Sequence, residues 1–222
     1  MNSFRKQLPT SPAFVRVLPF VIFVALTFFQ GKFGEESRYW IYLLKTVIGA
    51  WLIWLVWPLV REMRWKISWE AVLVGVAVFA IWVGLDNFYP KFFKPAPAWN
   101  PQTQFTETPM LACFLIVVRI VGSSLVVAPL EELFYRSFLY RYISQPDFNS
   151  VSLNYFNWRA FVAVSLFFGF AHREWIAGIL CGLAYQWLVI HKNRLGDAMT
   201  AHAITNLLLG VWVVWKGAWK FW

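Results

Sequence analysis

The segment PLEELFYRS, residues 129–137, places two adjacent glutamates beside a long apolar stretch. On a helix, positions four residues apart share a face, so Glu132 and Arg136 are expected to form an ion pair. Glu131 points to a different face, with Tyr135 as its i+4 neighbour. Because it lies outside that ion pair, Glu131 is available as a general base that takes a proton from water. Taken alone, the pattern also fits a salt bridge at the end of a membrane helix.

Two further groups of polar residues interrupt apolar runs later in the chain. His172 ends the segment FFGFAH, one helical turn after Phe168. His202 and Asn206 in AMTAHAITN are four residues apart and therefore leave one face of a helix. Polar groups in such runs face protein or a water-filled cavity, since lipid cannot solvate them. Donors on His202 and Asn206 suit an oxyanion that develops during acyl transfer, and interhelical hydrogen bonding is the structural alternative.

Three other polar residues complete this inventory. Arg119 and Lys45 also lie in apolar runs, and Lys45 is expected to reach the membrane surface by snorkelling. His191 belongs to the basic segment HKNRLGD and is expected to be solvated.

The composition indicates which elements position these residues. Hydrophobic residues make up 59% of the 222 residues and charged residues only 14%, against about 25% charged in an ordinary soluble domain. The apolar residues come in runs, and a span needs about 20 of them. We expect an all-α, polytopic transmembrane helical bundle of about 7–8 spans with an intramembrane polar cavity. Residues 1–222 are expected to form a single integral membrane domain.

Seven spans can be placed from the apolar runs, at 14–30, 39–60, 69–86, 110–128, 158–172, 175–190 and 197–215. The helical pattern is expected to continue over residues 128–145, until Pro146 and the polar segment 144–157 break it. The proline-rich segment 87–109 is expected to be irregular and external. Arg5 and Lys6 precede the first apolar run as in a signal peptide, but no cleavage site follows, so an uncleaved span is expected.

The formal net charge of +9 has its origin in short basic clusters between the apolar runs. The positive-inside rule explains such clusters, so nucleic-acid binding is not expected. A cytoplasmic N-terminus puts more Lys and Arg on the inside than on the outside. The lipid bilayer is therefore an expected partner.

The three motifs, taken in order, resemble the CPBP family of intramembrane proteases. The resemblance rests on EExxxR (Glu131 to Arg136), FxxxH (Phe168 to His172) and HxxxN (His202 to Asn206). It covers about residues 110–210, which would form a family-like catalytic core. This family includes the type II CAAX prenyl endopeptidases, or Ras-converting enzymes, and bacterial relatives formerly called Abi proteins. The short chain also resembles the exosortase-associated CAAX protease-related subgroup.

The resemblance implies an intramembrane endopeptidase with a bundle fold that acts on membrane-associated protein or peptide substrates. Together with the bacterial relatives, it implies a location in the inner membrane of a bacterial cell. The first glutamate would activate water for attack on a peptide carbonyl, assisted by the histidine of the second motif. The second glutamate and the arginine would orient the site, and the third motif would stabilise the oxyanion, with no cofactor required. The catalytic residues so implied are Glu131, Glu132, Arg136, His172, His202 and Asn206.

Two alternatives stay open. Glu131, His172 and His202 have donor types that suit zinc, which would make the chain a zinc-dependent membrane protease, although no HExxH segment is present. A non-catalytic membrane scaffold or immunity-type protein that keeps the fold is the other alternative.

The predicted spans and the motifs disagree on one point. The spans put Glu131 and His202 near the inner face and His172 near the outer face, because segment 158–172 rises about 21 Å. A shared site therefore requires shifted boundaries or short, tilted helices. The chain also departs from the family pattern at Ser137, where many members have glycine, and easier helix packing is the expected role of that position.

Overall fold

The computed structural model describes residues 11–92 and 97–222, and every regular element in these ranges is a helix. Three helices are long and apolar enough to cross a membrane by length and composition, at Ser37–Leu59, Pro109–Ser144 and Leu195–Lys216. Shorter apolar helices lie at Pro12–Phe28, Trp69–Gly84 and Trp158–Phe170. The chain is thus an all-α integral membrane protein, as the composition predicts. The number of spans and their orientation stay predictions.

Each of the seven predicted spans coincides with a helix, although the boundaries differ. The helices outside the long central one are α2 (Pro12–Phe28), α3 (Ser37–Val56), α4 (Trp69–Gly84), α5 (Pro101–Gln104), α9 (Trp158–Phe170), α10 (Trp175–Lys192) and α11 (Leu195–Lys216). The segment expected to be irregular contains α5 and a turn of 3-10 helix, η2 (Asp86–Phe88). Part of that segment, and the basic pair Arg5 and Lys6, lie outside the described residues.

One long helix runs from Pro109 to Ser144 and contains two π turns. Its pieces are α6 (Pro109–Gly122), the π turn η3 (Ser123–Val127), α7 (Ala128–Glu132), the π turn η4 (Leu133–Leu139) and α8 (Tyr140–Ser144). Pro129 has no N–H to donate to the carbonyl four residues before it, which accounts for the wider turn at η3. The predicted extension beyond residue 128 is confirmed. Glu131 therefore lies well inside this helix, and the position of the span end stays a prediction.

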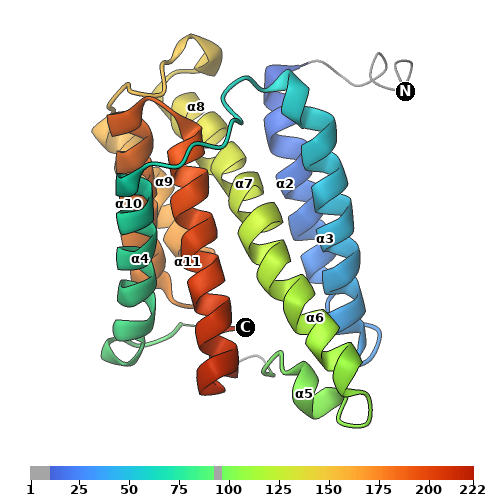
Figure 1. Cartoon of the computed structure of the whole chain (residues 1–222). Coiled ribbons are helices and arrows are strands. Elements are labelled where there is room, and N and C mark those ends of the chain that lie inside the picture. Colours follow the sequence, from blue (N-terminus) through green and yellow to red (C-terminus); the bar gives the residue numbers. More distant parts are fainter. Residues whose placement is uncertain (1–10, 93–96) are drawn as a thin grey trace, which may run out of the picture.

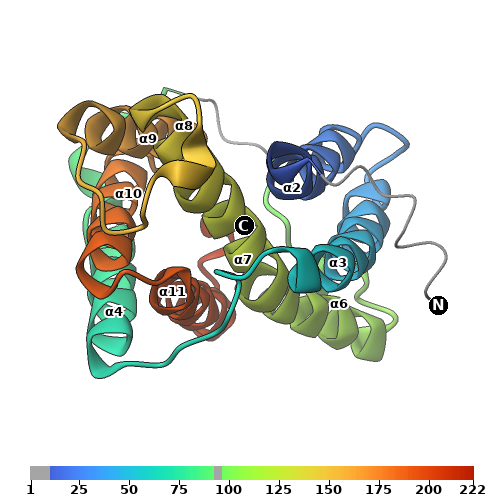
Figure 2. The same ribbon diagram turned by 90° about the horizontal axis from the view of Figure 1, so that it is seen from above.

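The long helix separates two groups of helices (Figures 1 and 2). It runs obliquely through the molecule, with α2 and α3 on one side and α4, α9, α10 and α11 on the other. Contacts are most extensive between α9 and α10, between α4 and α11, and between α2 and α3. The middle of the long helix, which carries Glu131 and Glu132, therefore lies between the two groups.

Small residues bring the helices of the larger group close together. A Cβ added to Gly169 on α9 would clash with Ile179 Cγ1 on α10, and one added to Gly75 on α4 would lie 2.6 Å from the Ala201 carbonyl oxygen on α11. Close helix contacts through small residues are common in membrane bundles. Gly169 stands between Phe168 and His172, so its tight contact with α10 also fixes the end of α9 that carries this motif.

Candidate active site

A cavity of about 830 Å³ lies between the two groups of helices. Four of the six predicted site residues line it: Glu131 from α7, His172 from the end of α9, and His202 and Asn206 from α11. Glu132 and Arg136 are not part of its lining; their side chains are fully buried behind it. The structure therefore brings the three motifs to one polar cavity, as the sequence predicts.

Glu132 and Arg136 form the ion pair expected from their spacing. Arg136 Nη1 lies 3.2 Å from Glu132 Oε1, and both side chains are 0% exposed. The guanidinium also lies over the rings of Phe168, Tyr135 and Tyr185, with Cζ 4.4, 5.6 and 5.6 Å from their centroids. Aromatic faces attract a cation, especially where water is excluded. The predicted ion pair is confirmed, and the aromatic setting holds the arginine in place.

His202 lies between the two glutamates. Its Nδ1 is 2.9 Å from Glu132 Oε1, and its Nε2 is 3.9 Å from Glu131 Oε2. A carboxylate accepts hydrogen bonds, so the Nδ1 proton of His202 is donated to Glu132. The ring is thereby oriented with Nε2 toward Glu131. Glu132 thus contacts a second motif as well as its own, which the sequence did not predict.

Glu131 has a setting unlike that of its neighbour. Its side chain keeps 15% exposure and lines the cavity, whereas that of Glu132 has none. Tyr135, its i+4 neighbour, also lines the cavity. Among the described residues, Glu131 Oε2 has no hydrogen-bond partner. The carboxylate that faces the open space is therefore the one not engaged in the ion pair.

His172 reaches the cavity from the opposite side. Its Nδ1 lies 2.7 Å from the Phe168 carbonyl oxygen, which can only accept, so Nδ1 donates and Nε2 is left for the cavity. Its ring lies edge-on to Trp82, with a centroid distance of 5.4 Å. The Phe168 ring stands between the two histidines, 4.7 Å from His172 and 6.0 Å from His202. His172 and Glu131 share the cavity without a hydrogen bond between them in the part of the chain that is described.

Asn206 contacts the long helix at its first π turn. Its Nδ2 donates to the Ser123 carbonyl oxygen at 2.8 Å. An amide nitrogen carries two N–H groups, so one donor is left for the cavity. The geometry is compatible with both interpretations of Asn206. It joins two helices by a hydrogen bond, and it lines the cavity, where it could donate to an oxyanion.

The expected conflict between His172 and Glu131 is resolved by two shifts from the predicted spans. The long helix continues to Ser144, so Glu131 lies within this helix and not at its end. Helix α9 has only 13 residues and ends at Phe170, so His172 follows a short helix. Both residues consequently line the same cavity.

Some residues around the site were not found from the sequence. Tyr185 of α10 donates from its hydroxyl to Thr205 Oγ1 at 2.7 Å, and its ring centroid is 5.0 Å from that of His202. Thr205 Oγ1 in turn donates to the carbonyl oxygens of Gly75 and Ala201, at 2.9 and 3.1 Å. A tyrosine and a threonine inside apolar runs carry no spacing signal, which is why they were overlooked.

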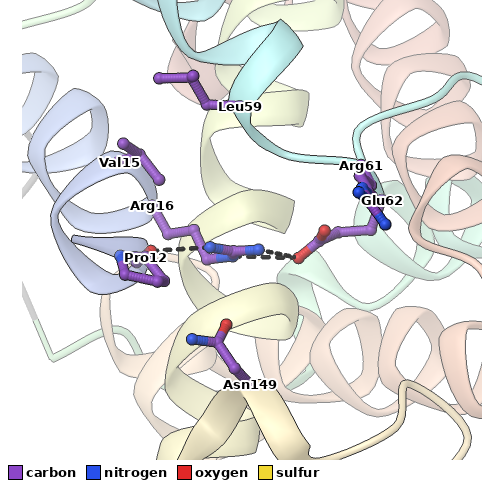
Figure 3. A pocket seen from close by; sticks show the side chains of 7 residues that line it. All are labelled: Pro12, Val15, Arg16, Leu59, Arg61, Glu62 and Asn149. Atoms are coloured by element: carbon purple, nitrogen blue, oxygen red, sulfur yellow. Dashed lines mark hydrogen bonds and ion pairs between the residues drawn. The ribbon is translucent and has the colours of Figure 1, made fainter. Parts of the chain in front are cut away.

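A smaller cavity of about 300 Å³ lies around an ion-pair cluster away from the three motifs (Figure 3). Glu62 Oε1, in the segment after α3, accepts from Arg16 Nη2 of α2 at 2.6 Å, from Ser137 Oγ at 2.7 Å and from Arg141 Nη2 at 2.8 Å. Ser137 is fully buried and also accepts from Arg16 Nε at 2.9 Å and Arg141 Nη2 at 3.0 Å. The serine that departs from the family pattern is therefore the centre of a hydrogen-bond cluster, beyond the packing role expected for it.

The donor geometry does not provide a zinc site in the described residues. No three His, Cys, Asp or Glu side chains in residues 11–92 and 97–222 converge as metal ligands would. The zinc alternative therefore finds no ligand set here.

Comparison with known families agrees with this geometry. Residues 113–208 match a family model described as type II CAAX prenyl endopeptidase Rce1-like. This part of the chain is similar to an Rce1-like domain. The matched range includes all six predicted site residues, and the family is one of peptidases. No curated protein and no solved structure matches the chain.

Proposed function

We propose that this Rce1-like protein is an intramembrane endopeptidase in which Glu131 is the general base. The observation that carries this proposal is the pairing of two unlike carboxylates about one histidine. Glu132 is buried and bound to His202 Nδ1, while Glu131 faces the cavity 3.9 Å from Nε2 of the same ring. A base must reach both water and substrate, and only Glu131 does so.

The proposed reaction is hydrolysis of a peptide bond. Glu131 takes a proton from water, and the water oxygen bonds to the carbonyl carbon while its π electron pair moves to oxygen. Asn206 Nδ2 and, in its protonated form, His202 Nε2 donate to that oxyanion. The C–N bond then breaks as Glu131 returns the proton to the leaving amine. The products are a carboxylic acid and a free amine.

The remaining residues have supporting roles in this proposal. Glu132 and Arg136 hold the His202 ring, in the way that a buried carboxylate orients a catalytic histidine. His172, with Nδ1 bound to the Phe168 carbonyl, presents Nε2 to the cavity and helps to position water. Membership of the exosortase-associated subgroup stays a prediction from the sequence.

Cleavage of a fluorogenic peptide by protein in liposomes tests the role of Glu131. We expect Glu131→Gln to lower the cleavage rate by about 10²–10⁴-fold, the range that general-base catalysis provides. Glu107→Gln, at an exposed glutamate that does not line the cavity, is the matched control and should keep the full rate. Cleavage by Glu131→Gln at the rate of the control would exclude this mechanism. Full cellular function with Glu131, His172 and His202 all replaced would favour the scaffold alternative.

A further inference from the structure

The cavity has a second polar region that none of the three motifs contains. Lys45 of α3 and Arg119 of α6 line it together with Glu131. Lys45 is 5% exposed, and its Nζ donates to Thr27 Oγ1 at 2.8 Å. The expectation that Lys45 snorkels to the membrane surface is therefore wrong. Its ammonium group stays inside the bundle, 4.5 Å from the Phe23 ring centroid.

Arg119 reaches the same region and is covered by aromatic rings. Its Cζ lies 4.8 Å from the ring centroid of Tyr42, 4.5 Å from that of Trp99 and 5.2 Å from that of Trp222. Lys45 Nζ lies 4.9 Å from the same Tyr42 ring. The two cationic groups are thus neighbours across one aromatic side chain.

Neither cation forms an ion pair with a carboxylate of the described residues, although the charge of Glu131 acts on Lys45 from a longer distance. No carboxylate of residues 11–92 and 97–222 lies within ion-pair distance of Lys45 or Arg119. Buried charges in proteins are normally paired, because desolvation of an unpaired charge is costly. Rings on the faces of a guanidinium leave its N–H edge free, and that edge fits the two oxygens of a carboxylate.

We propose that Lys45 and Arg119 form a subsite that binds a carboxylate of the peptide substrate. This inference rests on the proposed function, since it takes a peptide as the ligand. The rest of the cavity wall is largely apolar and aromatic, with Phe20, Phe23 and Val127 among its residues. Such a wall suits an apolar peptide that carries one negative group, from either a free C-terminus or an acidic side chain.

A binding experiment with four labelled peptides tests the subsite. The peptides share one apolar sequence and differ in having a C-terminal acid or amide, and Glu or Gln at the preceding position. Dissociation constants are measured by fluorescence anisotropy with the full chain in detergent, in the Glu131→Gln background to prevent cleavage. Lys45→Met and Arg119→Gln remove one cation each, Arg119→Lys keeps the charge without the fork, and unfolding temperatures verify that each variant is folded. Lys32→Met, at an exposed lysine that does not line the cavity, is the matched control.

We expect a peptide with a carboxylate to bind at least about tenfold more tightly than the neutral peptide, as charge-assisted hydrogen bonds allow. The carboxylate preference is the dissociation constant of the neutral peptide divided by that of the peptide with a carboxylate. This ratio should fall toward one in Lys45→Met and Arg119→Gln, fall partly in Arg119→Lys and persist in Lys32→Met. Which of the four peptides shows it identifies the terminal or the side-chain carboxylate as the source. Equal binding of all four peptides, or a preference that survives in both Lys45→Met and Arg119→Gln, would overturn the proposal.

Binding and cleavage measured on the Glu131→Gln variant distinguish this proposal from the proposed function. A carboxylate preference in binding, together with unchanged cleavage by Glu131→Gln, would support the subsite and contradict the catalytic role of Glu131. Loss of cleavage in Glu131→Gln without any preference for a carboxylate would do the reverse.

Discussion

Glu132 holds two partners that come from different helices. One oxygen of its buried carboxylate lies 3.2 Å from Arg136 Nη1 and 2.9 Å from His202 Nδ1. A carboxylate so engaged and so fully buried orients its neighbours and does not reach a substrate. Glu131, one residue earlier on the same helix, faces the cavity instead. Adjacent residues on a helix differ by about 100° in direction, and this difference gives two identical side chains separate roles.

This arrangement predicts how strongly Arg136 contributes to stability. Replacing Arg136 by Gln leaves a buried carboxylate without its cation, which typically costs roughly 3–5 kcal/mol. We expect a loss of that size in the free energy of unfolding, measured by denaturant titration in detergent. Arg159→Gln, at an exposed arginine, should change it by less than about 0.5 kcal/mol.

A second variant separates loss of the pair from loss of bulk. The double variant Glu132→Gln with Arg136→Gln removes both charges, so it should be more stable than the sum of the two single losses predicts. Strict additivity of the two single effects would contradict an interaction between these residues.

At the residue scale, the local part of the site could be predicted and the non-local part could not. The Glu132–Arg136 pair follows from positions four apart on one helix, which any helical stretch guarantees. The contact of Glu132 with His202 joins residues 70 positions apart and depends on how α11 lies against the long helix. No periodicity in the sequence contains that information.

Among the elements, the carboxylate of Glu62 joins its own segment after α3 to helix α2 and to the long central helix. It binds Arg16 of α2, Ser137 of the turn η4 and Arg141 of α8 (Figure 3 shows the contact with Arg16). Burial acts to raise the pKa of Glu62, but the charge of Arg16 and hydrogen bonds from Arg16 and Ser137 outweigh it. The pKa of this carboxyl group therefore lies below its ordinary value.

The lowered pKa predicts a pH-dependent contribution to stability. A carboxyl group whose pKa is lower in the folded than in the unfolded state stabilises the fold above its unfolded pKa, about 4.3 for glutamate. That contribution is lost as the pH falls through the folded value. We expect the difference in unfolding temperature between the native protein and Glu62→Gln to be largest near neutral pH and to shrink in acid.

Ser137→Ala is the control for this titration. It removes one hydrogen bond to Glu62 but keeps the carboxylate, so it should lower the unfolding temperature while keeping the loss of stability in acid. A difference between the native protein and Glu62→Gln that stays constant from neutral to acid pH would contradict the role of the ionised carboxylate.

At the element scale, the sequence predicts where helices occur better than where they lie. All seven apolar runs became helices, because hydrophobic length is a strong local signal. The continuation of the helix beyond residue 128 was predicted and is confirmed, but the π turn that accommodates Pro129 was not predicted. Tertiary contacts such as Asn206 to the Ser123 carbonyl support that turn, and they are invisible in the local sequence.

At the scale of the whole molecule, the cavity of about 830 Å³ forms where two groups of helices meet across the long central helix. The cavity receives side chains from most of the major helices, including Phe20, Lys45, Trp82 and Glu131. The sequence motifs mark only one part of its wall. The cationic part comes from α3 and α6, whose residues Lys45 and Arg119 are isolated in sequence and so form no recognisable pattern.

The donor arrangement of the cavity predicts how activity responds to metal removal. No cluster of three His, Cys, Asp or Glu side chains in the described residues could hold a metal ion. We expect peptide cleavage in liposomes to be the same before and after treatment with a strong chelator. Loss of cleavage that added zinc restores, together with stoichiometric zinc in the purified protein, would establish the metal alternative instead.

The two π turns of the long helix have a consequence for its tolerance of length changes. Each turn inserts extra chain into the winding, and the pair flanks the short stretch Ala128–Glu132 that carries both carboxylates. A π turn absorbs one extra residue, so deleting a single residue within Ser123–Val127 would restore regular winding with little rotation of the segment beyond it, whereas deleting one residue from the regular helix α6 would rotate that segment by about 100° around the helix axis. The glutamates would then point at neighbouring helices, although the local motif is unchanged. The phase of this helix, as much as its sequence, sets which carboxylate meets water.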